Sequence, residues 1–99
     1  MVQVIEIVTP DCGVCKMIAP AVNQAMKEFT DANGGDFEFK KLTVGHDAEA
    51  GDLAREHGIK AVPTFLIYRD AKLMRTYSWP GANVQALRHE IEHLLKENG

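Results

Sequence analysis

The feature that most constrains this chain is its only pair of cysteines, Cys12 and Cys15, which have two residues between them. A disulfide across so small a loop would stabilise the fold by roughly 2 kcal/mol, against about 3 kcal/mol for a fifteen-residue loop. A bond in such a short loop is, however, easy to make and to break. The C-x-x-C spacing therefore indicates thiol–disulfide chemistry before structural cross-linking.

Two other interpretations of the cysteine pair are a structural disulfide and one half of a zinc site. A four-ligand zinc site usually needs a second pair of Cys or His at matched spacing. The chain has no second cysteine pair, and His46 and His57 do not form a C2H2 pattern. We therefore favour redox chemistry and expect no metal site.

A second motif lies near the C-terminus, where His89 and His93 belong to a literal H-E-x-x-H, the zinc-protease pattern. A helical wheel places both histidines opposite the apolar face of the predicted last helix, in solvent. That face consists of Val84, Leu87, Ile91, Leu94 and Leu95. With no evident third ligand, we do not expect catalytic zinc here.

The composition fits a single domain spanning residues 1–99. Hydrophobic residues make up 45% of the chain, charged residues make up 25%, and the net charge is -3. A chain of this charge attracts neither nucleic acid nor anionic lipid, and no apolar run reaches the roughly eighteen residues of a membrane span. Residues 1–6 do not have the pattern of a signal peptide. We expect a cytoplasmic protein, in which a cycling dithiol is kept reduced, and a monomer.

The spacing of apolar residues predicts a regular alternation of strands and helices. The expected strands cover residues 2–9, 37–44, 62–68 and 73–77, and the expected helices begin at about Cys12, Asp47 and Asn83. Pro20 should kink the first helix, and residues 31–36 should form the loop that follows it. The order β-α-β-α-β-β-α predicts an α/β fold in which three helices cover both faces of a four-stranded mixed sheet.

The residues resemble the thioredoxin family over almost the whole chain. The matching segments occur in the family's order and are residues 12–20, 59–65 and 81–82. Val14 departs from the family, which usually has proline between the cysteines. Full-length thioredoxins begin with an extra strand and helix, so the chain is similar to the minimal thioredoxin or glutaredoxin-like cores.

This resemblance implies a role for each cysteine. Cys12 would lie at the exposed amino end of a helix, where free N–H groups and the helix dipole favour a thiolate, and it would attack a substrate disulfide. Cys15, one turn deeper, would resolve the mixed disulfide. The cysteines would carry the electrons, so no bound cofactor is expected.

The resemblance also implies a surface that binds the substrate. Pro63 would face the cysteine pair with a cis peptide bond, and the main chain of Val62 would pair with a substrate strand. The flat apolar rim around them would consist of Gly13, Val14, Val62 and Gly81. Trp79 would border the same groove, replacing the aromatic residue that thioredoxins usually have at the position of Asp11. The alternative for Trp79 is packing over the edge of the sheet.

Glu6 is a carboxylate in the middle of an apolar strand, where a charge is unfavourable unless it is paired or neutralised. The resemblance places it where thioredoxins carry a buried aspartate that relays a proton to or from the resolving cysteine. Lys41 matches the lysine that partners this acid from the next strand. Pairing and a raised pKa are both plausible for Glu6. The alternative is that Glu6 lies near a strand end and reaches water.

From these observations we expect a thiol–disulfide oxidoreductase that reduces protein disulfides and is recharged by a thioredoxin reductase or a similar electron donor. A glutaredoxin-like enzyme that uses glutathione is the first alternative, although Gly81 is followed by Ala82 and Asn83 where many glutaredoxins have a Gly-Gly-x-Asp type signature. The second alternative is a redox-inert binding module that keeps the fold.

Overall fold

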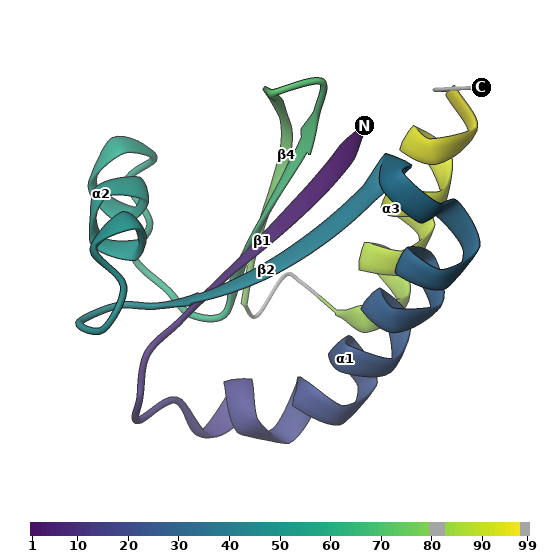
Figure 1. Ribbon diagram of the computed structural model, residues 1–99. Helices are drawn as coiled ribbons and strands as arrows, with labels where there is room; N and C mark the ends of the chain where they lie inside the picture. The colour runs from purple at the N-terminus through teal and green to yellow at the C-terminus, as the bar shows by residue number, and fades with distance from the viewer. Residues whose placement is uncertain (80–82, 98–99) are drawn as a thin grey trace.

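The computed structural model describes residues 1–79 and 83–97 and has the predicted order of elements (Figure 1). The strands are β1 (Val2–Val8), β2 (Phe37–Thr43), β3 (Thr64–Arg69) and β4 (Lys72–Ser78). The helices are α1 (Gly13–Asn33), α2 (Ala48–Glu56) and α3 (Val84–Glu97), and a short 3-10 helix, η1 (Gly34–Asp36), follows α1. No helix within the described ranges is long and apolar enough to cross a bilayer.

The four strands form one mixed sheet in the order β2-β1-β3-β4. The central strand β1 pairs in parallel with β2 and antiparallel with β3, and β3 and β4 form an antiparallel hairpin. In the turn of that hairpin, Asp70 and Ala71 have positive φ angles of 51° and 67°. This topology confirms the predicted four-stranded mixed sheet.

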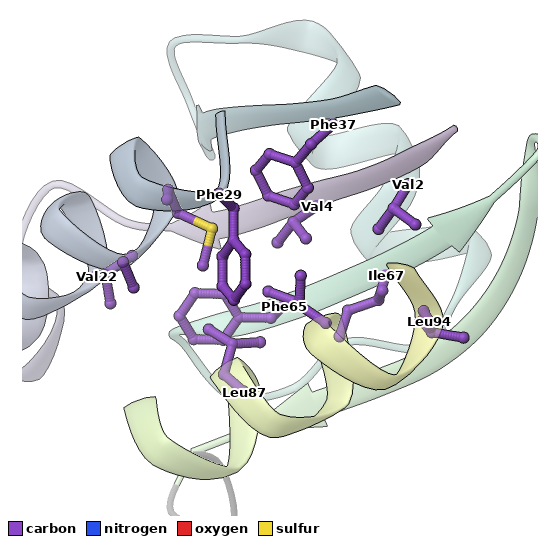
Figure 2. Close-up of a cluster of buried hydrophobic side chains, with 12 residues drawn as sticks. Val2, Val4, Val22, Phe29, Phe37, Phe65, Ile67, Leu87 and Leu94 are labelled. Atoms are coloured by element: carbon purple, nitrogen blue, oxygen red, sulfur yellow. The ribbon is translucent and has the colours of Figure 1, made fainter. Parts of the chain in front are cut away.

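The helices lie on both faces of the sheet, with α1 and α3 on one face and α2 on the other (Figure 1). The larger core, shown in Figure 2, fills the space between the sheet and the α1 and α3 helices. Its buried residues are Val2, Val4, Val22, Ala25, Met26, Phe29, Phe37, Phe65, Ile67, Leu87, Ile91 and Leu94. A smaller core beneath α2 contains Ile5, Ile7, Leu42, Ala50 and Leu66.

Because both faces of β1 are covered, the strand is apolar almost throughout rather than alternating. Successive side chains still point to opposite faces, so Val2 and Val4 contact the α1 and α3 side while Ile5 and Ile7 contact the α2 side. The same alternation places Glu6 on the α1 and α3 side of the sheet, between Val4 and Val8.

The first helix differs from the prediction at its C-terminal end. Residues 31–33, expected in a loop, continue α1, and the Asn33 side chain donates a hydrogen bond to the Phe29 carbonyl at 2.7 Å. The helix stops at Gly34, whose φ of 56° is readily adopted by glycine. Pro20 lies inside α1, and Figure 1 shows the helix changing direction along its length, as a proline kink predicts.

The third strand is also shorter than predicted. It begins at Thr64, so Val62 and Pro63 form a separate segment that precedes β3. The Val62–Pro63 peptide bond is cis. This segment lies at the end of the sheet where α1 begins, and it forms one wall of the site described below.

Candidate active site at the cysteine pair

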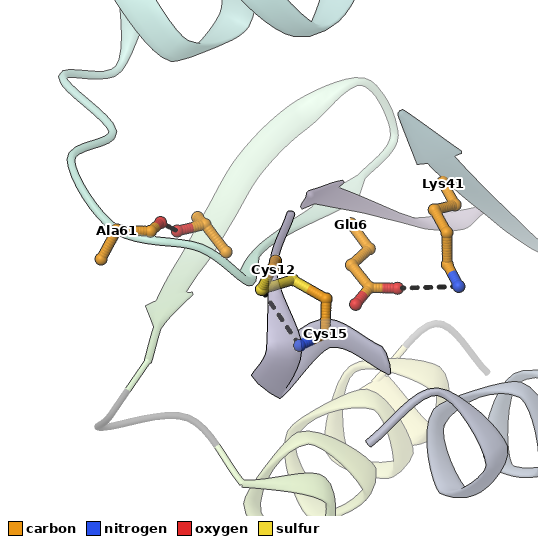
Figure 3. Close-up of a disulfide and its surroundings, with 6 residues drawn as sticks. Glu6, Cys12, Cys15, Lys41 and Ala61 are labelled. Atoms are coloured by element: carbon orange, nitrogen blue, oxygen red, sulfur yellow. Dashed lines mark hydrogen bonds and ion pairs between the residues drawn. A yellow bond between two sulfur atoms is a disulfide. The ribbon is translucent and has the colours of Figure 1, made fainter. Parts of the chain in front are cut away.

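The two cysteines are joined by a disulfide at the start of α1, with their Cα atoms 5.2 Å apart (Figure 3). Cys12 is the N-cap residue of the helix, and its Sγ accepts a hydrogen bond from the Cys15 main-chain N–H at 3.0 Å. The Cys12 N–H donates in turn to the Thr9 carbonyl, which closes the turn between β1 and α1. The cysteine side chain therefore occupies the position where an oxygen usually caps a helix.

The helix terminus favours negative charge on Cys12 more than on Cys15. The first N–H groups of a helix lack partners within the helix, and together with the helix dipole they stabilise an anion at the N-cap. In the disulfide form the Cys15 N–H donates to the Cys12 sulfur, the atom that would carry the negative charge after reduction. Cys15 lies inside the first turn of the helix and lacks this advantage.

The two cysteines differ less in solvent exposure than the sequence analysis suggested. We expected Cys12 at an exposed helix end, but Cys12 is only 9% exposed and Cys15 is 7% exposed in the disulfide form. The cause is the apolar contact around the sulfur atoms, to which Val8, Val14 and Val62 contribute. Electrostatics at the N-cap, rather than exposure, is thus what distinguishes the two sulfur atoms.

Of the predicted rim residues, Val14 and Val62 contact the cysteine pair, and Gly13 is exposed at the first position of α1. Pro63 is buried beside them. Gly81 lies outside the described residues. Val8 also belongs to the cluster, although the sequence analysis did not single it out. Its position two residues after Glu6 on the same strand face is the signal that could have identified it.

An apolar cavity of about 240 Å³ lies next to Val62 and the turn at Thr9. Its remaining walls come from β1, the end of β2, α2 and the segment before Pro63. They are Ile7, Val44, Ala54, Ile59, Lys60 and Ala61. Sequence analysis did not predict this cavity, because its walls meet only when the ends of β1 and β2 and the segment after α2 converge.

Trp79 lies close to the Pro63 segment, at the end of β4. It is partly buried, and its main-chain N–H donates a hydrogen bond to the Pro63 carbonyl at 3.0 Å. The structure thus places the main chain of Trp79 next to the cis proline.

Glu6 is buried, which rules out the alternative that it reaches water. Its side chain is 1% exposed, and neither carboxyl oxygen has a hydrogen-bond partner among the described residues. Lys41 lies opposite it on β2, with its Nζ 3.8 Å from Glu6 Oε1. Burial raises the pKa of Glu6 to about 6, and the positive charge of Lys41 limits this rise. Figure 3 shows the Glu6 carboxyl pointing toward the region of Cys15, with Lys41 on its other side.

The histidines of the H-E-x-x-H motif lie on α3. Both are exposed, and His93 Nε2 is 2.9 Å from Glu97 Oε1. Within residues 1–79 and 83–97, no group of three or more His, Cys, Asp or Glu side chains is placed to hold a metal ion.

Comparison with known proteins places these features in a family. The thioredoxin family model matches residues 1–93. Thioredoxin F of rice chloroplasts is 38% identical over 91 residues, which cover 92% of this chain and 44% of the rice protein. Thioredoxin-1 of Saccharomyces cerevisiae is 34% identical over 80 residues, which cover 81% of this chain and 68% of the yeast protein. The chain thus spans less than half of the chloroplast relative and about two thirds of the yeast protein.

Solved structures agree with the sequence comparison. The thioredoxin of Fasciola hepatica superposes with a TM-score of 0.74 at 33% identity, covering 93% of this chain and 79% of that protein. Spinach chloroplast thioredoxin f superposes with a TM-score of 0.75 at 30% identity, covering 94% of this chain and 69% of that protein. The family-model match, the sequence identities and the fold together show that this chain belongs to the thioredoxin family.

Proposed function

We propose that this protein is a thiol–disulfide oxidoreductase that reduces protein disulfides through Cys12 and Cys15. The observation that carries the proposal is the disulfide at the N-cap of α1, with the Cys15 N–H donating to the Cys12 sulfur. A cysteine pair held in this way can accept two electrons as the disulfide and donate two electrons as the dithiol. Membership in the thioredoxin family supports the same chemistry.

In the proposed cycle the reduced protein starts with two thiols. The Cys12 thiolate attacks one sulfur of a substrate disulfide, forms a mixed disulfide and expels the other substrate sulfur as a thiolate. Cys15 then loses its proton and attacks the Cys12 sulfur, which forms the Cys12–Cys15 bond and releases the second substrate thiolate. The substrate gains two electrons, and the protein is left in the disulfide form described above.

Glu6 is our candidate for the group that accepts the Cys15 proton. A carboxyl group with a pKa of about 6 is largely deprotonated at neutral pH yet far more basic than an ordinary glutamate. Before the transfer, the positive charge of Lys41, 3.8 Å away, offsets the negative charge of the Glu6 carboxylate. After the transfer the Glu6 carboxyl group is neutral, and Lys41 keeps its charge in contact with water.

The main chain of Val62 is our candidate for the site that holds the substrate. Among the described residues, no main-chain hydrogen bond uses the N–H or the C=O of Val62, although its side chain contacts the cysteine cluster. An extended substrate segment that pairs with these groups would lie across the disulfide. Gly13, Val14, Trp79 and Gly81 would complete the rim around it.

We further propose that a thioredoxin reductase or a similar donor restores the dithiol, and that the protein works as a monomer in a reducing compartment such as the cytoplasm. The experiment that tests the proposal is the reduction of insulin disulfides, with dithiothreitol as the electron source. Acceleration above the uncatalysed rate is expected for wild type and not for Cys12→Ser. No acceleration would leave the redox-inert binding module as the better description.

A second assay separates the two redox alternatives. The oxidised protein is supplied either with NADPH and thioredoxin reductase or with glutathione, glutathione reductase and NADPH. NADPH consumption with thioredoxin reductase is the expected result. Consumption only in the glutathione system would establish the glutaredoxin-like alternative instead.

A further inference from the structure

Thr64 is a buried hydroxyl that the proposed chemistry does not use. It directly follows Pro63 and is 0% exposed. Among the described residues, Glu6 and Thr64 are the buried residues with polar side chains. A hydroxyl taken out of water is unfavourable unless its hydrogen bonds are replaced. The partners of Thr64 therefore indicate what this residue holds in place.

The Thr64 hydroxyl takes part in two hydrogen bonds. Its Oγ1 lies 2.6 Å from the Ala61 carbonyl oxygen and 2.8 Å from the Ser78 hydroxyl oxygen. A carbonyl can only accept, and a hydroxyl has a single proton to donate. Thr64 therefore donates to Ala61, and Ser78 donates to Thr64. The result is a directed chain from β4, through the first residue of β3, to the segment before Pro63.

A second bond attaches the same segment to β4. The Pro63 carbonyl accepts the Trp79 N–H at 3.0 Å, one residue beyond Ser78. The carbonyls on either side of Val62, those of Ala61 and Pro63, are thus both held by other groups of this chain. Val62 thus lies between two carbonyl groups that hydrogen bonds hold in place. Among the described residues, the N–H and C=O of Val62 itself make no main-chain hydrogen bond.

We propose that Thr64 is a positioning residue whose hydroxyl, together with Ser78, holds the Ala61 carbonyl so that the main chain of Val62 stays presented to a protein substrate. The inference rests on the proposed function, because it concerns how that same site binds its substrate. Thr64 contributes to substrate binding through Val62, and it does not take part in the transfer of electrons between sulfur atoms.

The sharpest test compares Thr64→Ser with Thr64→Ala, since these two variants differ only in the hydroxyl group. For insulin reduction, KM should rise about fivefold in Thr64→Ala, the size of effect that loss of one ordinary hydrogen bond produces. KM should stay within about twofold of wild type in Thr64→Ser. The kcat, and the rate with a small aromatic disulfide that offers no strand to pair, should change much less in both variants.

Thr76→Val is the matched control for removal of a threonine hydroxyl, because Thr76 is exposed on β4. Thr76→Val should leave the KM for insulin and the rate with the small disulfide at the values of wild type. An unchanged KM in Thr64→Ala would overturn the proposal, as would a Thr64→Ser variant that fails as badly as Thr64→Ala. Equal losses with insulin and the small disulfide would show general damage instead of a positioning role.

A measurement that needs no activity distinguishes failure of this inference from failure of the proposed function. Amide chemical shifts of Val62 in the oxidised protein should move in Thr64→Ala and remain near wild type in Thr64→Ser. Wild type that reduces no insulin would refute the proposed function, and the amide shifts would still decide whether Thr64 positions Val62. Identical Val62 shifts in all three proteins would refute the positioning role even if insulin is reduced.

Discussion

Glu6 and Lys41 face each other across β1 and β2, yet the 3.8 Å between Glu6 Oε1 and Lys41 Nζ is too long for a hydrogen bond. Lys41 is 35% exposed, whereas Glu6 is 1% exposed. The lysine therefore remains solvated while the carboxylate has lost its water. Burial outweighs the attraction between the two charges, and the pKa of Glu6 rises to about 6.

The first prediction concerns stability and pH. Because the pKa of Glu6 rises from 4.5 in its ordinary state to about 6 in the fold, unfolding releases its proton between these pH values. The contribution of Glu6 to the free energy of unfolding should therefore decrease by about 2 kcal/mol as the pH rises from below 4.5 to above 6. Glu6→Gln should lack this loss and should be the more stable protein at pH 7.

Urea unfolding of the oxidised protein at a series of pH values measures this effect. Glu56→Gln, an exposed change on α2, is the matched control and should retain the pH dependence of wild type. A Glu6→Gln variant with the same pH dependence as wild type would show that Glu6 is ionised in the fold as readily as in the unfolded chain.

The second prediction concerns the pH profile of turnover. If Glu6 accepts the Cys15 proton, insulin reduction should increase as the pH rises through about 6, and Glu6→Gln should lose that increase. Lys41→Met removes the charge that lowers the pKa of Glu6, so the increase should move to higher pH.

Lys40→Met is the matched control for Lys41→Met. Lys40 lies next to Lys41 on β2, but its Nζ bonds Glu49 of α2 at 3.2 Å, on the other face of the sheet. The pH profile of insulin reduction by Lys40→Met should coincide with that of wild type. Equal profiles for all four proteins would make Glu6 a bystander in the transfer of the proton.

The third prediction separates the roles of the cysteines. Cys15→Ser should accumulate mixed disulfides through Cys12, because the N-cap favours a thiolate on Cys12 and no thiol remains to resolve the intermediate. Cys12→Ser should accumulate none. The measurement is the mass of the adduct after incubation with an oxidised peptide, and equal trapping by both variants would contradict the assignment.

The fourth prediction concerns Asp11, which is exposed and precedes the N-cap residue. Its negative charge opposes a thiolate on Cys12, whereas the helix is capped by Cys12 itself and does not depend on Asp11. Asp11→Asn should speed alkylation of reduced Cys12 by iodoacetamide at pH 7 by roughly two- to threefold, with little change in Tm. An unchanged or slower rate would mean that the Asp11 carboxylate points away from the sulfur.

Local sequence patterns predicted the main features of the fold and the cysteine pair of the candidate site. The C-x-x-C spacing indicated the disulfide that we propose to be redox-active, and the period of the apolar residues and the turn signals predicted the order of the elements and the mixed sheet. These features depend on residues that are close together in the chain. For such residues, the period of a helix or strand determines which side chains share a face. The end of α1 was predicted less well: residues 31–33 suggested a loop, yet they continue the helix, and the Asn33 side chain donates to the Phe29 carbonyl one turn back.

The environment of the site was decided only by the tertiary structure. Glu6 lies 35 residues from Lys41, and the strand register determines how far apart the two charges are and how little water reaches the carboxylate. The Thr64 hydroxyl finds Ser78, fourteen residues away, because β3 and β4 pair with these two residues opposite each other. Burial, pKa and hydrogen-bond partners depend on such distant neighbours, so a single sequence can name the candidate residues but the packed fold determines what each of them contacts.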